Sequence, residues 1–183
     1  MRSLRDIANE IFLEAIRAVD PYESVKKQLL RIRDIFGRGG YNNFFVISFG
    51  KAAHPMASSV EDFFPHELIT GGVVITKYGY VIEDRRSRLS LYEAGHPLPD
   101  ERGLLATEEV LELLRGAVDP KTFILCLISG GGSSLFISPM DGLTLGDKKK
   151  TTELLMMAGA DIYELNTVRK HISKVKGGRF AEY

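Results

Sequence analysis

The sequence predicts an α/β protein with three layers, a mostly parallel sheet with helices on both of its faces, preceded by a pair of helices. Two observations lead to this prediction. Short apolar runs without polar alternation are typical of strands buried on both sides. These runs alternate along the chain with helical patterns, which favours parallel strands joined by right-handed crossovers. The clearest runs are residues 44–49, 71–76 and 122–128.

The first 40 residues are expected to form two helices that pack on the main domain. Apolar side chains recur at helical spacing between Ile7 and Val19, and again between Val25 and Ile35. Pro21 separates the two patterns, and the glycine-rich residues 37–40 end the second. The sequence is therefore divided into a helical segment, 1–40, and an α/β domain, 41–183.

Within residues 41–183 the elements follow one another in a Rossmann-like order. The strand at 44–49 leads through a glycine turn into a helix that Pro65 ends. Strands at 71–76 and 89–93 come next, and Asp100 is placed to cap a following helix. The strand at 122–128 is the most apolar. Two further helices are expected, at Thr144–Met157 and Asp161–His171.

Composition excludes several classes of protein. With 24 basic and 24 acidic residues, the net charge of zero gives no support for nucleic-acid binding. No apolar stretch approaches the roughly 18 residues of a membrane span. The single cysteine, Cys126, lies in an apolar run, where we expect it to be buried and inert in a reducing, cytoplasmic compartment. The spacing of the four histidines fits no common metal site.

The most informative motif is the loop Ser129-Gly130-Gly131-Gly132-Ser133-Ser134, which follows the strand at 122–128. Three glycines allow successive amides to converge on an anion, and the serine hydroxyls can add hydrogen bonds. The loop is neither a Walker A motif, nor a dinucleotide fingerprint, nor a nucleophile elbow. It predicts a phosphate-binding turn, with a plain flexible turn as the alternative.

Two further loops follow predicted strands. Lys51 comes directly after Gly50 at a helix N-terminus, where a cation is unfavourable unless an anion binds there. A solvated surface lysine is the alternative. His96 lies in a loop stiffened by Pro97 and Pro99. It is either a ligand contact or proton carrier, or a residue that only organises the loop.

The C-terminal region is strongly basic. Its positive side chains are Arg169, Lys170, Lys174, Lys176 and Arg179. Lys170 and Lys174 lie one helical turn apart, and like charges at this spacing repel, which favours an anionic partner. A solvated basic face is the alternative interpretation.

Five motifs occur in an order that resembles the glycerate 2-kinase family, whose C-terminal part is the MOFRL domain. They are Phe49-Gly50-Lys51-Ala52-Ala53, Val74-Ile75-Thr76-Lys77-Tyr78-Gly79, Glu93-Ala94-Gly95-His96-Pro97, the loop Ser129–Ser134, and Asn166-Thr167-Val168-Arg169-Lys170-His171 with Lys176-Gly177-Gly178-Arg179. The resemblance runs from about residue 44 to Tyr183.

The resemblance implies ATP-dependent phosphorylation of D-glycerate to 2-phosphoglycerate by a cytoplasmic enzyme, with Mg²⁺ accompanying the nucleotide. It assigns catalysis to Lys51, Arg169 and Lys170. Together with the loop and charge patterns above, it leads us to expect substrate or phosphate binding by Ser129, Gly130, Gly131, Gly132, Ser133, Ser134, His96, Asn166, Lys176 and Arg179. The partners are then glycerate and a nucleotide, with no nucleic acid and no membrane. Assembly into a homo-oligomer stays open.

One departure from the family concerns length. The family continues beyond the Lys-Gly-Gly-Arg motif into a second, MOFRL domain, which is absent from these 183 residues. The α/β domain is therefore expected to be incomplete and the chain to have little or no turnover by itself. Two rival functions stay open: a non-catalytic phosphate- or nucleotide-binding module, and a hydroxypyruvate reductase, against which the missing dinucleotide fingerprint argues.

Overall fold

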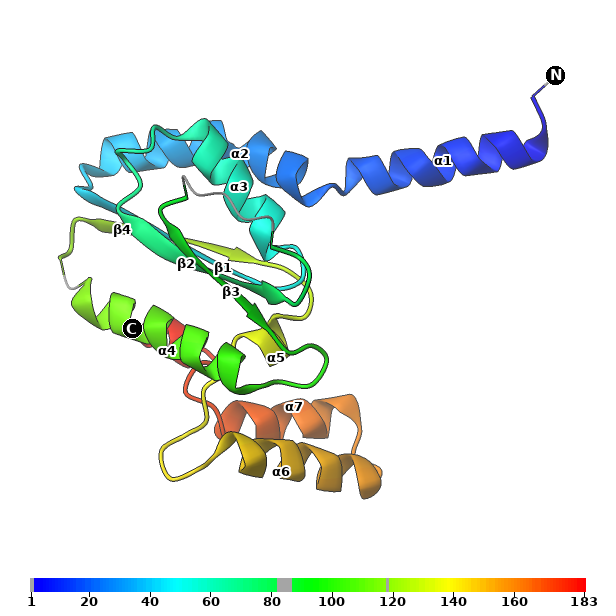
Figure 1. Cartoon of the computed structure of the whole chain (residues 1–183), viewed down its shortest axis with the longest axis vertical. Helices are drawn as coiled ribbons and strands as arrows, with labels where there is room; N and C mark the ends of the chain where they lie inside the picture. The colour runs from blue at the N-terminus through cyan, green and yellow to red at the C-terminus, as the bar shows by residue number, and fades with distance from the viewer. Residues whose placement is uncertain (1, 82–86, 118) are drawn as a thin grey trace.

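The computed structural model describes residues 2–81, 87–117 and 119–183. Its centre is a four-stranded sheet in the order β3-β2-β1-β4, in which every pairing is parallel (Figure 1). The strands are β1 (Asn43–Phe49), β2 (Gly71–Lys77), β3 (Leu89–Ala94) and β4 (Thr122–Ile128). Each strand occurs where the apolar runs predicted it, so the predicted α/β class is confirmed.

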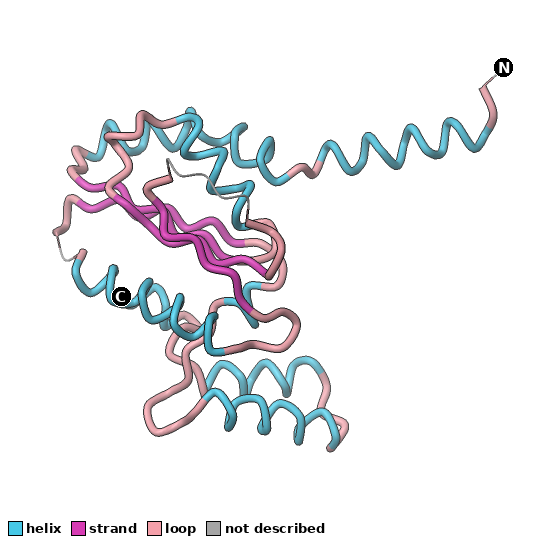
Figure 2. Tube along the Cα trace, viewed as in Figure 1, coloured by secondary structure: helices cyan, strands magenta, loops and turns pink. Residues whose placement is uncertain are grey.

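Helices cover both faces of the sheet, as Figure 2 shows. On one face, α2 (Pro21–Gly39) and α3 (Ala53–Phe63) enclose a core that contains Leu29, Phe44 and Val60. On the other face, α4 (Glu101–Gly116) encloses a second core with Ile47 and Leu111. Parallel strands require crossovers of this kind, and α3 joins β1 to β2 while α4 lies between β3 and β4. The predicted three-layer arrangement is confirmed.

The two N-terminal helices differ in their packing. Both begin with side-chain caps, Ser3 for α1 (Leu4–Ala18) and Asp20 for α2. Helix α2 buries Val25 and Leu29, whereas α1 buries no residue and projects away from the sheet (Figure 1). Of the two helices, α2 thus packs on the sheet in this structure, while α1 contributes nothing to its cores.

Strand β4 is less buried than its composition predicts. It forms one edge of the sheet, and α4 contacts β2 and β3 rather than β4. On the side of β4 that faces α2 and α3, Leu127 is buried in the core. On the other side, Ile124, Cys126 and Ile128 are exposed. The expectation of a buried Cys126 is thus wrong, because an apolar run does not reveal which strand lies at an edge.

Beyond β4, the chain forms a short helix and a helical hairpin. These are α5 (Gly132–Leu135), α6 (Leu145–Met157) and α7 (Ile162–His171), followed by the 3₁₀ turn Arg179–Glu182. Capping boxes start the two longer helices, at Thr144 with Asp147 and at Asp161 with Glu164. A bridge between Pro139 and Ser173 closes the base of the hairpin. In the described part of the chain, no helix has the length and apolarity that crossing a bilayer requires.

Candidate functional site

Two of the predicted loops lie side by side at the carboxyl edge of the sheet. Phe49 and Ile128 are partners in the register of β1 and β4, so the segments that follow them start together. The amide of Lys51 donates to the carbonyl of Gly130 at 2.8 Å, and the amide of Ala52 donates to Oγ of Ser129 at 3.0 Å. The Gly-Lys turn and the glycine-serine loop therefore form one hydrogen-bonded unit.

Glycine is required where these loops meet. Gly50 has a φ of +125°, and a Cβ there would lie 2.2 Å from Oγ of Ser129. Gly131 has a φ of +89°, and a Cβ there would lie 2.9 Å from Nε2 of His96 and 3.0 Å from Cγ of Lys51. These close approaches leave no room for a side chain. The structure thus brings Lys51 and His96, from two different loops, against the same glycine.

The three serines of the loop have different roles. Ser129 accepts the Ala52 amide, and Ser134 is buried and donates to the carbonyl of Gly131 at 3.1 Å. These two hydroxyls hold the loop in shape. Ser133 is exposed, and its Oγ accepts a hydrogen bond from Nη2 of Arg169 at 2.9 Å. Gly132 is buried against the ring of Phe49. Ser133 is therefore the serine that connects the loop to the basic region.

The loop that carries His96 is fixed at its far end by Asp100. The carboxylate of Asp100 accepts the Gly103 amide at 3.0 Å, which caps α4, and the hydroxyl of Tyr78 at 2.6 Å. A Cβ on Gly95 would lie 2.4 Å from the carbonyl of Leu98, so the loop is tightly folded. His96 is partly buried, two residues after the end of β3. This loop positions His96 beside Lys51 and places the prolines toward a neighbouring cavity.

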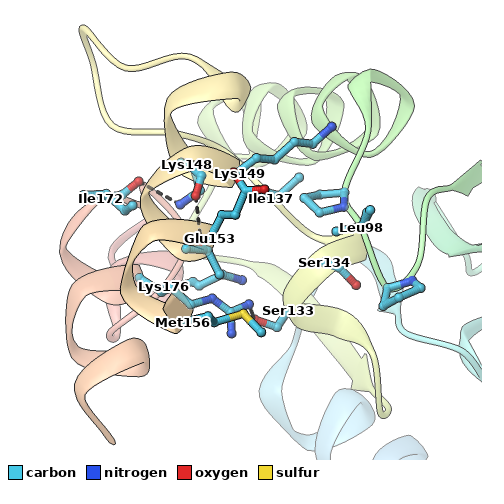
Figure 3. A pocket seen from close by; sticks show the side chains of 14 residues that line it. Leu98, Ser133, Ser134, Ile137, Lys148, Lys149, Glu153, Met156, Ile172 and Lys176 are labelled. Atoms are coloured by element: carbon cyan, nitrogen blue, oxygen red, sulfur yellow. Dashed lines mark hydrogen bonds between the residues drawn. The ribbon is translucent and has the colours of Figure 1, made fainter. Parts of the chain in front are cut away.

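A cavity of about 570 Å³ opens next to these loops (Figure 3). Volumes of this size are typical of ligand sites. Its walls come from the proline loop, α5, α6 and the end of α7. The residues that line it are Pro97, Leu98, Pro99, Ser133, Ser134, Ile137, Lys148, Lys149, Thr152, Glu153, Met156, Arg169, Ile172 and Lys176. Four of these side chains are cationic and one, Glu153, is acidic.

Two of the lysines are held in the cavity wall. Lys148 is buried, with 6% of its surface exposed, and its Nζ donates to the carbonyl of Ile172 at 2.8 Å. Nζ of Lys176 donates to the carbonyl of Phe136 at 3.2 Å. Burial, reinforced by the charge of Arg169, lowers the pKa of Lys148 to about 8. Burial together with Lys148 and Arg169 likewise lowers the pKa of Lys176 to about 8.

Three residues of the basic region that were assigned to the site from the sequence do not line this cavity. Lys170 is exposed, and its carbonyl accepts Nη1 of Arg179 at 2.7 Å. Arg179 also donates to the carbonyl of Ser173 at 3.2 Å and lines a separate hollow with Asp141. Asn166 is partly buried on α7 and does not line the cavity. Of the basic region, Arg169 and Lys176 reach the cavity.

Lys148 is a cavity residue that sequence reasoning missed. The only signal was the run Lys148-Lys149-Lys150 inside a predicted helix. Three consecutive residues point in three directions around a helix, so one of them faces the body of the protein if the helix packs. Which one faces inward depends on how α6 sits against α7, and the sequence alone does not give this.

The described residues offer no ready metal site. Among residues 2–81, 87–117 and 119–183, no three His, Cys, Asp or Glu side chains cluster as metal ligands do. Mg²⁺ usually takes one or two protein carboxylates along with phosphate oxygens and water. A cluster of three such ligands is therefore not what a nucleotide-bound Mg²⁺ would require of this part of the protein.

Comparison with known proteins relates this geometry to a family. Residues 7–183 match the family described as a domain of unknown function, DUF4147. The chain is 43% identical to a glycerate 2-kinase of Pyrococcus horikoshii, over 98% of the chain and 40% of that protein. It is 37% identical to an Agrobacterium vitis protein provisionally named a hydroxypyruvate reductase, over 98% of the chain and 38% of that protein.

A solved structure gives the same result. The crystal structure of a glycerate kinase from Thermotoga maritima matches with a TM-score of 0.85 and 42% identity, over 98% of this chain and 41% of that chain. The chain thus spans about two fifths of the length of the proteins it matches. Both the family match and the sequence identity extend over nearly the whole chain, so it belongs to the DUF4147 family, that of the glycerate 2-kinases, and corresponds to its N-terminal portion.

Proposed function

We propose that the protein, at the full length of its family, transfers the γ-phosphoryl group of ATP to the 2-hydroxyl of D-glycerate. The observation that carries this proposal is the convergence of Lys51 and His96 on Gly131, beside a cavity lined with cations. Phosphoryl transfer depends on positioning and on stabilising negative charge, and these residues supply both. The names of the most similar relatives support the same reaction.

Lys51 is the residue to which we assign the reacting end of the substrates. Its amide is tied to Gly130, and its exposed side chain lies against Gly131, so its ammonium is available to an anion at the carboxyl edge of the sheet. It would hold the glycerate carboxylate or the transferring phosphoryl group as a point charge. The cost of placing a cation at the start of α3 is then offset by the bound anion.

The transfer itself forms a bond between the substrate hydroxyl oxygen and the γ-phosphorus. The bond from that phosphorus to the bridging oxygen breaks, and ADP leaves with the electron pair. The hydroxyl proton needs an acceptor, and His96, which lies against the same glycine as Lys51, has the chemistry for it. Mg²⁺ would accompany the nucleotide through its phosphate oxygens, and we assign no carboxylate of the described residues to it.

A second candidate function is a binding module for phosphorylated ligands. It is favoured by one observation, that these 183 residues form a cavity lined by four cations. A hydroxypyruvate reductase has less support, because neither the Gly130–Gly132 loop nor the Gly50 turn carries the dinucleotide fingerprint. The three functions predict different products. A kinase releases ADP, a binding module forms no product, and a reductase oxidises NADH to NAD⁺.

The test uses the protein at family length, with D-glycerate, ATP and Mg²⁺, and follows ADP release in a coupled assay. Lys51→Ala should lower kcat/KM by about 100-fold or more, as removal of a charge-stabilising group does. Lys121→Ala is the matched control. Lys121 is an exposed lysine next to the start of β4, at the amino-terminal ends of the strands and therefore at the end of the sheet opposite to Lys51. A loss below about threefold for Lys51→Ala would place Lys51 outside the site.

The same preparation separates the rivals. Hydroxypyruvate with NADH should give no oxidation, and any sustained NADH consumption would favour the reductase. The 183-residue chain alone should release little or no ADP. Robust turnover by that chain would contradict the expectation drawn from its length.

A further inference from the structure

Four cations line the cavity, and three of them are held there by hydrogen bonds to the protein. Lys148 comes from α6, Arg169 from α7, and Lys176 from the segment after α7. Over the described ranges, none of the three has a carboxylate oxygen within 4.0 Å. The acidic side chain of the cavity, Glu153, is paired instead with Lys150 at 3.0 Å. Buried charge of one sign is costly unless a counter-charge binds.

The hydrogen bonds of these groups leave donors available. A lysine ammonium has three N–H donors, and Lys148 and Lys176 each use one on a backbone carbonyl. Arg169 has five donors and uses one on Ser133. Figure 3 shows the Lys148 amine turned toward the Ile172 carbonyl, with the Lys176 side chain between α6 and the turn at Ser133. The carbonyls and the hydroxyl thus hold the cations in place without neutralising them.

We propose that Lys148, Arg169 and Lys176 form the subsite for the polyphosphate of a nucleoside triphosphate, the phosphoryl donor. The proposal rests on the kinase function proposed above. Three convergent cations match the several negative charges of a polyphosphate, whereas the single carboxylate of glycerate needs only one of them. Low-dielectric walls strengthen each of these attractions.

The rest of the cavity is suited to the nucleoside. Its apolar wall contains Leu98, Ile137, Met156 and Ile172. A cavity of about 570 Å³ is far larger than a three-carbon acid requires, and it lies within the range for sites that bind larger organic ligands. A flat base against this wall and a polyphosphate at the cations would fill both halves of the cavity.

The position of the cavity agrees with this assignment. Ser133 and Pro97 line it. Ser133 is two residues after Gly131, and Pro97 directly follows His96, which lies with Lys51 against Gly131. The donor subsite would therefore adjoin the place assigned to the acceptor. Lys170, which the sequence suggested as a phosphate contact, has no part in this arrangement because it does not line the cavity.

The test is calorimetric titration of the 183-residue chain with the non-hydrolysable β,γ-imido analogue of ATP, at pH 7 and without metal. We expect saturable binding that Arg169→Gln and Lys176→Met each weaken at least tenfold. Lys121→Met should leave the affinity unchanged, because Lys121 is an exposed lysine that does not line the cavity. Wild-type affinity in both cavity variants, or no binding by the wild-type chain, would overturn the proposal.

Additional titrations make the outcome specific. Inorganic tripolyphosphate should bind the same cations more weakly than the nucleotide analogue, and equal affinities would refute the role of the apolar wall. Among the described residues, the Arg169 side chain donates to Ser133 and to no backbone carbonyl, so Arg169→Gln should keep its fold, and circular dichroism checks this. At family length, Lys51→Ala should lose turnover yet still bind the analogue. Binding without turnover in the unmutated family-length protein would reject the kinase and leave the subsite standing.

Discussion

Arg169 donates a hydrogen bond from Nη2 to Oγ of Ser133 at 2.9 Å, across 36 positions of sequence. This contact joins α7 to the end of the glycine-serine loop. It links the cation cavity to the loop that meets Lys51, so the two halves of the candidate site share one contact. The effect of losing the hydrogen bond between Arg169 and Ser133 can be measured as a change in affinity for an anion.

Arg169→Lys keeps the positive charge and removes the planar fork that reaches Ser133. We expect this change to weaken tripolyphosphate binding by the 183-residue chain roughly fivefold, corresponding to about 1 kcal/mol for a lost hydrogen bond. Lys170→Met is the control, because Lys170 is exposed and outside the cavity. If Lys170→Met weakened tripolyphosphate binding to a similar extent, Lys170 would belong to the binding site.

Part of the candidate site could be predicted from the sequence because sheet topology determines it. Parallel strands bring their carboxyl ends to one edge, so the loops after 44–49 and 122–128 had to lie near each other. The hydrogen bond from Lys51 to Gly130 is the direct result. The glycines of both loops were equally informative, since a positive φ and close contacts explain Gly50 and Gly131.

The remaining features depend on packing that the sequence does not encode locally. Lys148 and Lys150 belong to the same run, yet one is buried and the other exposed. Cys126 lies in an apolar strand, but the edge position of β4 exposes it. Helix α1 has a helical apolar pattern as clear as that of α2, but no layer covers it. In each case, whether a residue is buried depends on which other element packs against it and not on the type of the residue itself.

Gly131→Ala tests how tightly the loops fit. A Cβ would lie 2.9 Å from two atoms of the His96 ring and 3.0 Å from Cγ of Lys51, in addition to the strain of a positive φ. We expect a loss of catalytic efficiency of about 10-fold or more in the protein at family length, because a small displacement of positioned groups is costly.

The matched control for that change is Gly142→Ala. Gly142 has a φ of +82°, close to that of Gly131, but a Cβ there would have nothing within 4 Å. Both variants should lose a similar free energy of unfolding from backbone strain, on the order of 1 kcal/mol. Only Gly131→Ala should lower turnover. Equal kinetic effects would show that strain alone, and not contact with Lys51 and His96, matters.

Thr107 supports the cavity wall from α4. It is fully buried, donates to the carbonyl of Gly103 at 2.7 Å and accepts the amide of Ile137 at 2.9 Å. Thr107→Val keeps the shape but leaves the buried Ile137 amide without its acceptor, which should lower the free energy of unfolding by about 1–3 kcal/mol. Urea denaturation measures this. Thr167→Val, at an exposed threonine that bonds within α7, should change stability by less than about 1 kcal/mol.

The depressed pKa values of Lys148 and Lys176 predict a pH dependence of stability. Both values are about 8 in the folded chain, against an ordinary lysine value of 10.5. Between these limits the unfolded chain binds more protons than the folded one, so the free energy of unfolding rises with pH. The cost of the buried charges is present in full below about pH 8 and disappears as the pH approaches 10.5.

Lys148→Met removes one of these groups and should flatten the rise. Between pH 7 and pH 10, wild type should gain more unfolding free energy than the variant, by on the order of 2 kcal/mol. The comparison uses the change with pH, because the variant also loses the hydrogen bond to Ile172 at every pH. Loss of the Lys148 charge also relieves part of the depression of the Lys176 pKa, which flattens the curve of the variant further, whereas the remaining lysines and the tyrosines titrate in both proteins and cancel. Lys150→Met, on the exposed side of α6, should follow the wild-type curve. A Lys148→Met curve parallel to wild type would mean that the Lys148 amine titrates as an ordinary solvated lysine.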